Sequence, residues 1–291
     1  MSNKNSTFSF RLISLAIIFI SLSLLSSGCA SRIIRVADKA EILMPELVSD
    51  MKKVRLVFVG EAHDEQWHHD TQLALIKALH ESGSLVAVGI EMFRAENQSK
   101  LDAWVSGRMD EDEFIKEYLL NWQVPWPKYS NIFLYARDNR IPLVGLNIPK
   151  KVIRQVFKDG YESLTAEQLQ EVPGAKCEVD AEYEKFIRRA MSEHTMSEST
   201  FKKFCEAQMV WDSSMALKSI NYLKANQEKT LVVLAGSAHS WRRGIPNQVK
   251  KLHGPPHVII LPESAMSSDI SEITVDDTDY VWVGSFADLF K

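Results

Sequence analysis

Short apolar runs recur along the chain and predict the strands of a buried sheet. The run from Val54 to Val59 is rich in β-branched residues and ends at Gly60, and the run from Leu85 to Ile90 has the same character. Brief apolar runs bounded by turn residues are typical of strands that are buried on both faces. Further strands are expected at 143–146, 231–235, 257–261 and 280–283.

The segments between these runs have the spacing of amphipathic helices. Helical periodicity is clear over 66–81, and helices are also expected over roughly 95–105, 110–120 and 129–139. Trp122 to Pro127 carries two prolines and is predicted to be a loop. Residues from Pro149 to about Asn226 are predicted to be helical, with a break near Pro173.

Strands that alternate with helices define the expected fold class. The pattern predicts an α/β protein with a central, mostly parallel β-sheet flanked by helices. The helical stretch from Pro149 to Asn226 forms a large helical insertion before the last core strands.

The N-terminus has the pattern of an export signal. Lys4 and Arg11 precede an apolar stretch from Leu12 to Leu25, and small residues lead from there to Cys29. The stretch is shorter than the roughly 20 residues that a membrane-spanning helix needs. We therefore predict a signal peptide over 1–28, a lipidated tether over 29–50 and a single α/β domain over 51–291.

Cys29 is the expected lipidation site, because the residues before it resemble a bacterial lipobox. Ser26 stands where a lipobox usually has leucine, so ordinary signal cleavage near Cys29 stays open. By the same resemblance, Ala30 after the cysteine favours the outer membrane of a Gram-negative bacterium. The expected location is that membrane or, without the lipid, the periplasm.

Composition limits the partners of the chain. A formal net charge of −4 with no basic stripe makes nucleic acid an unexpected partner. Besides Cys29, the chain has Cys177 and Cys205. These two could pair in an oxidising compartment or stay as free thiols, and both alternatives are open.

Two matching motifs follow two of the predicted strands. Gly60-Glu61-Ala62-His63 and Gly236-Ser237-Ala238-His239 share the form Gly-x-Ala-His after an apolar run. Ligands of open α/β sheets bind beyond the carboxyl ends of the strands. If the two strands are neighbours, His63 and His239 face one crevice.

Further polar residues lie close to these motifs. Glu61 is two residues before His63. Glu91 ends the second predicted strand, and a carboxylate buried there needs a partner. That partner is either a base such as Arg94 or another group of the candidate site. His68 is expected to be solvated, whereas His69 could point back to the crevice. Elsewhere, Gln208 and Asp212 share one helix face and either hold a buried network or line a pocket.

Together these motifs resemble the ChaN-like haem-binding lipoproteins of the Tiki/erythromycin-esterase-like superfamily. The resemblance spans about residues 50 to 262. It rests on an ordered set of segments: Val59–Asp64 with His69 and Gln72, Glu91–Phe93, Tyr129, Ala136-Arg137, Gly145–Pro149, Ala207-Gln208 with Asp212, Met215-Ala216, Gly236–His239 and Gly244–Pro246. Ala238 departs from the family, which usually has glycine before the second histidine.

The resemblance implies an envelope protein that binds haem for iron uptake, as a homodimer and with an outer-membrane haem receptor as a partner. It implies Tyr129 as the iron ligand, with Tyr135 second, since a phenolate is a hard ligand for ferric iron. Glu61, His63, His239, Gln208 and Asp212 would line the cofactor site. Apolar surface for the porphyrin and cations for its propionates would come from Trp126, Met92 and Phe93, and from Arg94, Lys128, Arg137, Arg242 and Arg243.

The same residues also support a hydrolase, because the superfamily includes such enzymes. Glu61, His63 and His239 would then hold zinc or manganese, supported by Glu91. A metal-free version would use His63 as a general base.

Overall fold

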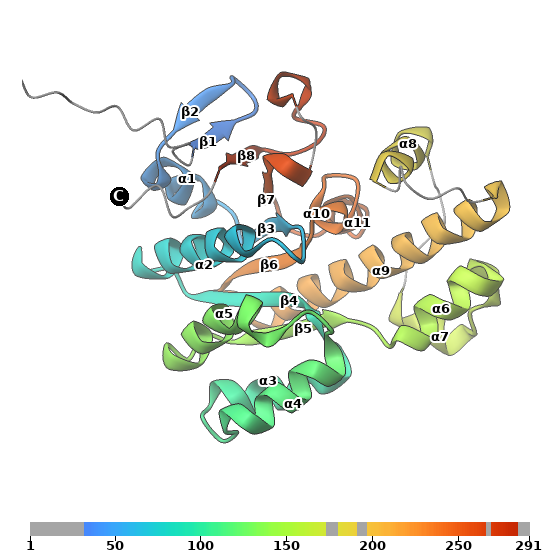
Figure 1. The fold of residues 1–291 in the computed structure, drawn as a ribbon, viewed down its shortest axis with the longest axis horizontal. Coiled ribbons are helices and arrows are strands. Elements are labelled where there is room, and N and C mark those ends of the chain that lie inside the picture. Colours follow the sequence, from blue (N-terminus) through green and yellow to red (C-terminus); the bar gives the residue numbers. More distant parts are fainter. Residues whose placement is uncertain (1–31, 173–179, 191–196, 266–268, 285–291) are drawn as a thin grey trace, which may run out of the picture.

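An eight-stranded sheet forms the centre of the protein. The computed structural model describes residues 32–172, 180–190, 197–265 and 269–284. The strands lie in the order β2-β1-β8-β7-β3-β6-β4-β5, and those from β8 to β5 run parallel (Figure 1). Their bounds are β1 Arg32–Arg35, β2 Ala40–Ile42, β3 Leu56–Glu61, β4 Val86–Arg94, β5 Leu143–Asn147, β6 Thr230–Gly236, β7 His257–Pro262 and β8 Tyr280–Val283. The prediction of a mostly parallel sheet is confirmed.

Helices cover both faces of the sheet because its strands are apolar on both sides. Val57 and Val59 of β3 pack with the helices of one face, and Leu56 and Phe58 pack with those of the other. The first face carries α1 Met44–Met51, α2 Gln66–Glu81, α3 Gln98–Val105, α4 Glu111–Asn121 and α5 Trp126–Asp138. The second carries α9 Glu198–Ala225, α10 Ser237–Ser240 and α11 Ile245–Lys251. The burial of this much apolar surface is the main source of stability.

The predicted tether is wrong from Arg32 onward. Arg32 to Arg35 forms β1, which pairs antiparallel with β8, and β2 continues the sheet outward. Helix α1 then buries Leu47 and Met51 against α2. These strands are only four and three residues long, too short for a clear alternating pattern. The partner of β1, strand β8, lies at the other end of the sequence.

The predicted loop from Trp122 to Pro127 is also wrong at its end. Helix α5 already begins at Trp126, with Pro127 in its first turn. Proline is tolerated there because the N–H groups of the first turn have no partner within the helix.

The helical insertion lies between β5 and β6, as predicted. Its described helices are α6 Lys150–Asp159, α7 Ala166–Glu171, α8 Ala181–Ala190 and α9. Cys205 is buried in α9, whereas Cys177 lies outside the described residues, as does the predicted signal with Cys29. Within the described part of the chain, no helix is both long and apolar enough to cross a membrane.

A substitution at Gly145 tests the close approach of β5 to the end of β4. A Cβ at this position would lie 2.8 Å from the backbone oxygen of Arg94. Backbone cannot yield as a side chain can, so we expect Gly145→Ala to lower the free energy of unfolding by about 2–3 kcal/mol in urea denaturation.

Gly89→Ala is the matched control, because its nearest contact is the flexible end of Leu146, also at 2.8 Å. Gly89→Ala should lower the free energy of unfolding clearly less than Gly145→Ala. Equal losses in the two variants would contradict the proposed difference between backbone and side-chain contacts.

Candidate functional site

Strands β3 and β6 are direct neighbours, and their ends bring the two matching motifs together. Glu61 lies opposite Gly236 in the parallel register. Glycine at this position leaves room for the histidine of the other motif, since a Cβ on Gly236 would lie only 3.2 Å from Cε1 and Nε2 of His63. The two motifs therefore lie side by side at the carboxyl ends of the strands.

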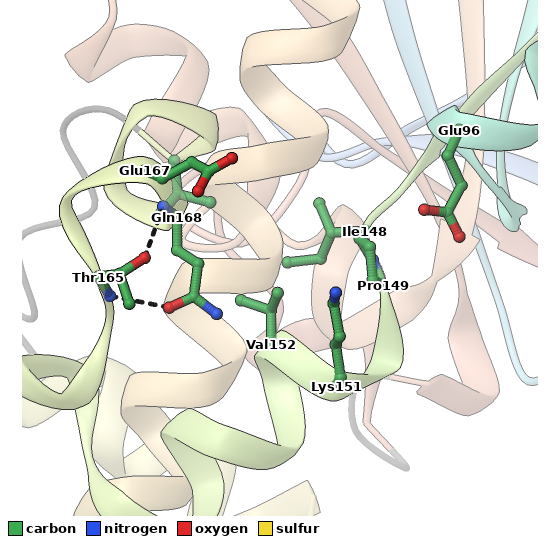
Figure 2. A pocket seen from close by; sticks show the side chains of 9 residues that line it. Glu96, Ile148, Pro149, Lys151, Val152, Thr165, Glu167 and Gln168 are labelled. Carbon is green, nitrogen blue, oxygen red and sulfur yellow. Dashed lines mark hydrogen bonds between the residues drawn. The ribbon is translucent and has the colours of Figure 1, made fainter.

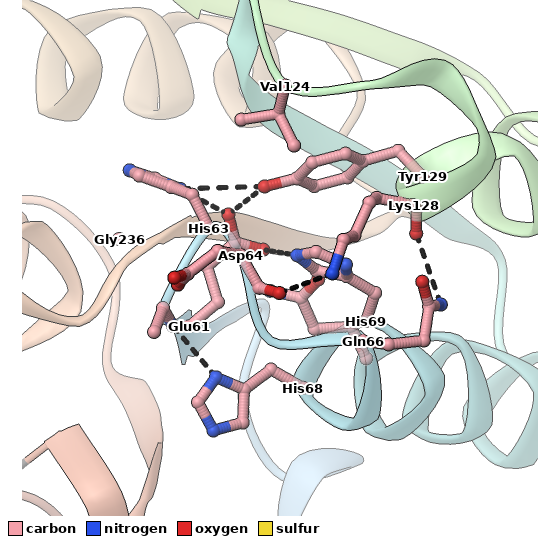
Figure 3. A network of polar contacts seen from close by, with 12 residues as sticks. Glu61, His63, Asp64, Gln66, His68, His69, Val124, Lys128, Tyr129 and Gly236 are labelled. Carbon is pink, nitrogen blue, oxygen red and sulfur yellow. Dashed lines mark hydrogen bonds and ion pairs between the residues drawn. The ribbon is translucent and has the colours of Figure 1, made fainter.

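The first polar network is built around the buried carboxylate of Glu61 (Figure 3). Its Oε1 lies 2.6 Å from Nδ1 of His63 and accepts a hydrogen bond from the hydroxyl of Tyr129. Its Oε2 lies 3.5 Å from Nε2 of His69, the ring of which packs against Tyr129 at 4.0 Å between centroids. His69 thus points back to the end of β3, on the side where His63 lies.

These contacts set the proton affinities of the network. Burial alone would raise the pKa of Glu61, but the contacts with His63, His69 and Tyr129 lower it below the usual value. Burial lowers the pKa of His63, yet Glu61 and Glu91 raise it overall. Burial and the Glu61 carboxylate strongly raise the pKa of the Tyr129 phenol, which therefore stays protonated.

The second network lies on the β6 side and contains Glu91, Asp212 and His239. Nδ1 of His239 lies 2.6 Å from Oδ1 of Asp212, and its Nε2 lies 3.8 Å from Oε1 of Glu91. The other oxygen of Glu91 accepts a hydrogen bond of 2.8 Å from the backbone N–H of Gly236. Burial lowers the pKa of His239, but the two carboxylates raise it to about 9. Burial also raises the pKa of Asp212 to about 6.

This geometry decides two alternatives that the sequence left open. Glu91 belongs to the site and not to an ion pair with Arg94, which binds Glu96 at 2.9 Å instead. Asp212 belongs to a buried hydrogen-bond network. Gln208 is half-buried, and no hydrogen bond between described residues joins it to Asp212 or His239.

His68 differs from its prediction as a solvated residue. It is only 1% exposed, and its Nδ1 accepts a hydrogen bond of 2.8 Å from the backbone N–H of Ala62. Its Nε2 lies 3.1 Å from the hydroxyl of Ser264. His68 is therefore a neutral ring that fixes the loop between Glu61 and α2, and burial lowers its pKa to about 4.

Several other predicted site residues lie elsewhere. Arg137 is near the end of α5, where it stacks over Trp104 and pairs with Asp138. Tyr135 contacts His80 at 3.0 Å. Met92 and Phe93 are buried in the core and present no surface to a porphyrin.

The remaining predicted cations and Trp126 have structural partners. Trp126 packs edge-on against Tyr118 and Phe114. Of the cations, only Lys128 borders the first network, where it donates to the backbone oxygen of Asp64 (Figure 3). Arg242 pairs with Asp279 and Arg243 with Asp180.

Three site residues were not predicted as such from the residue pattern. Trp122 lies edge-on to the ring of His63 at 5.0 Å between centroids. Trp211 lies at the same distance from the ring of His239, and its indole N–H donates to the side chain of Asn147. Asn147 in turn donates to the backbone oxygen of Glu91. The position of Asn147 at the end of a predicted strand was the available signal.

A pocket of about 340 Å³ lies beside this edge, beyond the end of β5 (Figure 2). Ile148, Val152 and Gln168 are among the side chains around it. None of the predicted site residues lines this pocket. The two polar networks and the pocket therefore lie at separate places.

Comparison with known proteins identifies the class of protein that this fold and site define. The model of the haem-binding uptake family, of the Tiki superfamily and ChaN type, matches residues 47–249. That match covers most of the chain, which therefore belongs to the ChaN-like haem-binding family.

Solved structures agree with this fold. ChaN of Campylobacter jejuni, described with cofacial haem binding, matches with a TM-score of 0.66 at 20% identity, over 88% of this chain and 97% of that one. The type III effector HopBA1 matches with a TM-score of 0.51 at 12% identity, over 83% and 93% of the two chains.

A curated relative matches only in part. The chloroplastic protein RETICULATA-RELATED 5 of Arabidopsis thaliana is 29% identical over 146 residues, which is 45% of this chain. The match spans only 20% of that relative's length.

The donor atoms at the edge decide how a haem could be held. Tyr129 is completely buried, and its hydroxyl is already donated to Glu61. The side chain of His63 is 38% exposed, and its Nδ1 alone contacts Glu61. Of the two, only the ring of His63 is therefore partly open to solvent, and the assignment of Tyr129 as an iron ligand stays a prediction.

The burial of His68 predicts a specific loss of stability in acid. Its pKa is about 4 in the folded protein against about 6.5 unfolded, so the unfolded chain binds the proton first as the pH falls. Stability is thus fully present above about pH 6.5 and is lost towards pH 4. We expect wild type to lose about 2–3 kcal/mol more than His68→Asn between pH 7 and pH 4.5, measured by urea unfolding.

His68→Asn keeps an acceptor near the N–H of Ala62 and removes the titrating ring. His253→Asn removes an exposed imidazole and controls for the substitution itself. If wild type and His68→Asn lose the same free energy of unfolding between pH 7 and pH 4.5, this role of His68 is contradicted.

Proposed function

We propose that the protein binds haem at the carboxyl ends of β3 and β6 and serves haem or iron uptake in the cell envelope. Its membership of the ChaN-like haem-binding family carries the choice of ligand. One observation supports the position: His63 is the partly exposed ring of the edge, backed by the buried carboxylate of Glu61. The expected homodimer and the outer-membrane receptor remain predictions.

The donor geometry gives no comparable support to the metal-assisted hydrolase. Among the described residues, no three histidine, cysteine, aspartate or glutamate side chains converge as a metal site would require. The Nδ1 atoms of His63 and His239 are instead bonded to separate carboxylates, Glu61 and Asp212.

We further propose that the protein is exported and anchored by a lipid on Cys29. The positive residues, the apolar stretch from Leu12 to Leu25 and the small residues before Cys29 support this proposal. An anchor of this kind would hold a haem-binding domain at a membrane without a membrane-spanning helix.

A hemin titration tests the ligand and its position. Wild type should bind hemin saturably, with a shifted Soret band. Gly236→Val places a side chain against the ring of His63, and we expect it to weaken binding about tenfold or more, as steric overpacking of this size implies.

Lys151→Trp is the control for position, because Lys151 borders the separate pocket beyond β5. It should leave the affinity unchanged. Loss of binding in Lys151→Trp but not in Gly236→Val would move the site to that pocket, and no saturable binding by wild type would overturn the proposed function.

Metabolic labelling with a clickable fatty acid tests the anchor in a Gram-negative host. Wild type should carry the label and fractionate with membranes, whereas Cys29→Ser should lack the label, because the acceptor thiol is gone. Cys177→Ser is the matched cysteine control and should stay labelled. Label that persists in Cys29→Ser would refute the assignment.

A further inference from the structure

An apolar groove of about 440 Å³ lies between α1 and α2, and none of the residues of the two polar networks lines it. Met44 at the start of α1 and Leu73, Ala74 and Ala78 of α2 supply its apolar lining. Ala74 and Ala78 are four residues apart and therefore share one face of the helix. Their short side chains leave the space between longer neighbours open, so this face of α2 is hollow.

Leu43 adjoins this groove, because it immediately precedes Met44. Its side chain is 71% exposed, the largest exposed fraction among the large apolar side chains of the described residues. A single exposed leucine is common on protein surfaces. Here, however, it stands beside an apolar groove, and the two together form an apolar surface that suits a partner made of hydrocarbon.

The groove lies close to the point where the chain enters the domain. Ile33 of β1 pairs antiparallel with Ile42 of β2, so Leu43 follows β2 on the side from which the chain enters β1. Figure 1 shows β1, α1 and one end of α2 in the same part of the molecule, and α1 packs on α2. Cys29 is three residues before Arg32, a span of at most about 11 Å. A lipid on Cys29 would therefore bring a bilayer within reach of Leu43.

The charges around this surface indicate what kind of contact it can make. Arg32 lies 3.8 Å from Glu41, and Lys77 shares the border of the groove with Asp70 and Glu81. The acids balance or outnumber the bases, whereas surfaces that bind anionic headgroups carry clusters of lysine and arginine. The contact that this surface can make is therefore with the apolar tails of a leaflet and not with its charged headgroups.

We propose that Leu43 and the groove between α1 and α2 form a membrane-contact surface, which takes acyl tails of the leaflet that holds the lipid on Cys29. This inference rests on the proposed lipid anchor. One acyl chain alone binds a bilayer only marginally, and a second contact makes the attachment stable. Transfer of this apolar surface from water to hydrocarbon supplies that contact and fixes which face of the domain lies on the membrane.

A spin label at Leu43→Cys tests the contact in the lipidated full-length chain on phosphatidylcholine vesicles. Cys177→Ser removes the other thiol that could react, since Cys205 is buried and Cys29 carries the lipid. On vesicles, collisions of the label with a polar nickel chelate should fall about tenfold or more, because hydrocarbon excludes polar solutes. Collisions with oxygen should rise, and high salt should leave both unchanged.

Leu120→Cys in the same background is the matched control. Leu120 is also an exposed leucine, at 68%, but it belongs to α4. Its label should stay accessible to the nickel chelate on vesicles. The Cys29→Ser chain in buffer gives the reference without a membrane, and there the label at Leu43→Cys should be accessible as well. Thermal unfolding of each variant identifies any that fail to fold.

The outcomes separate the contact from the anchor. A wild-type chain that acquires no lipid and does not sediment with vesicles overturns the proposed anchor, and the membrane contact with it. A lipidated chain that sediments but leaves the Leu43 and Leu120 labels equally accessible to nickel overturns the contact and leaves the anchor intact. Shielding of the Leu43 label already in the Cys29→Ser chain in buffer means that a second copy covers the groove, which also overturns the contact.

Discussion

The buried carboxylate of Glu61 is the interaction on which the arrangement of the site depends. A carboxylate removed from water is stable only when other groups supply hydrogen bonds and charge. His63, His69 and Tyr129 come from three different places in the sequence and meet at this one group. The end of β3, the start of α2 and the first turns of α5 are thereby held together at one edge.

In the second network, beside β6, buried carboxylates again have hydrogen-bond partners, but the residues differ. Glu91 fixes the backbone of Gly236, and Asp212 holds His239. Asp212 comes from α9, so the long helical insertion also contributes to the edge. The two histidines nevertheless differ in access, since His239 is only 7% exposed. The repeated motif therefore gives one partly exposed ring, His63, and one buried ring, His239.

The central strands and most residues of the candidate site could be predicted from the sequence, because the patterns that indicate them lie in short segments. The apolar runs of β3, β4, β5 and β6 are buried on both faces, and each is recognisable without knowledge of its neighbours. The Gly-x-Ala-His motifs follow two of these runs directly. A candidate site at the carboxyl ends of the strands could accordingly be predicted from the sequence, with Glu61, His63, Glu91, Asp212 and His239 among its residues.

The sequence-based predictions differ from the structure where residues far apart in the sequence determine whether a side chain is buried and what it contacts. His68 is buried because Ala62 and Ser264 bind its two nitrogens, and Ser264 is almost 200 residues away along the chain. The burial of Tyr129 in the first turn of α5 likewise depends on distant residues, since Tyr118 and His69 pack against its ring. Arg137 shares the helix of Tyr129 but lies two turns further on, over Trp104. A single sequence does not contain these pairings.

The antiparallel pairing of β1 has a consequence for orientation. Arg32, the first residue of β1, lies opposite Val283 at the carboxyl end of β8, so it is level with the edge that carries His63. Cys29 is three residues before Arg32, a reach of about 11 Å at full extension. A lipid on Cys29 would therefore join the chain on the side of the sheet where the carboxyl ends of the parallel strands, and with them both polar networks, lie.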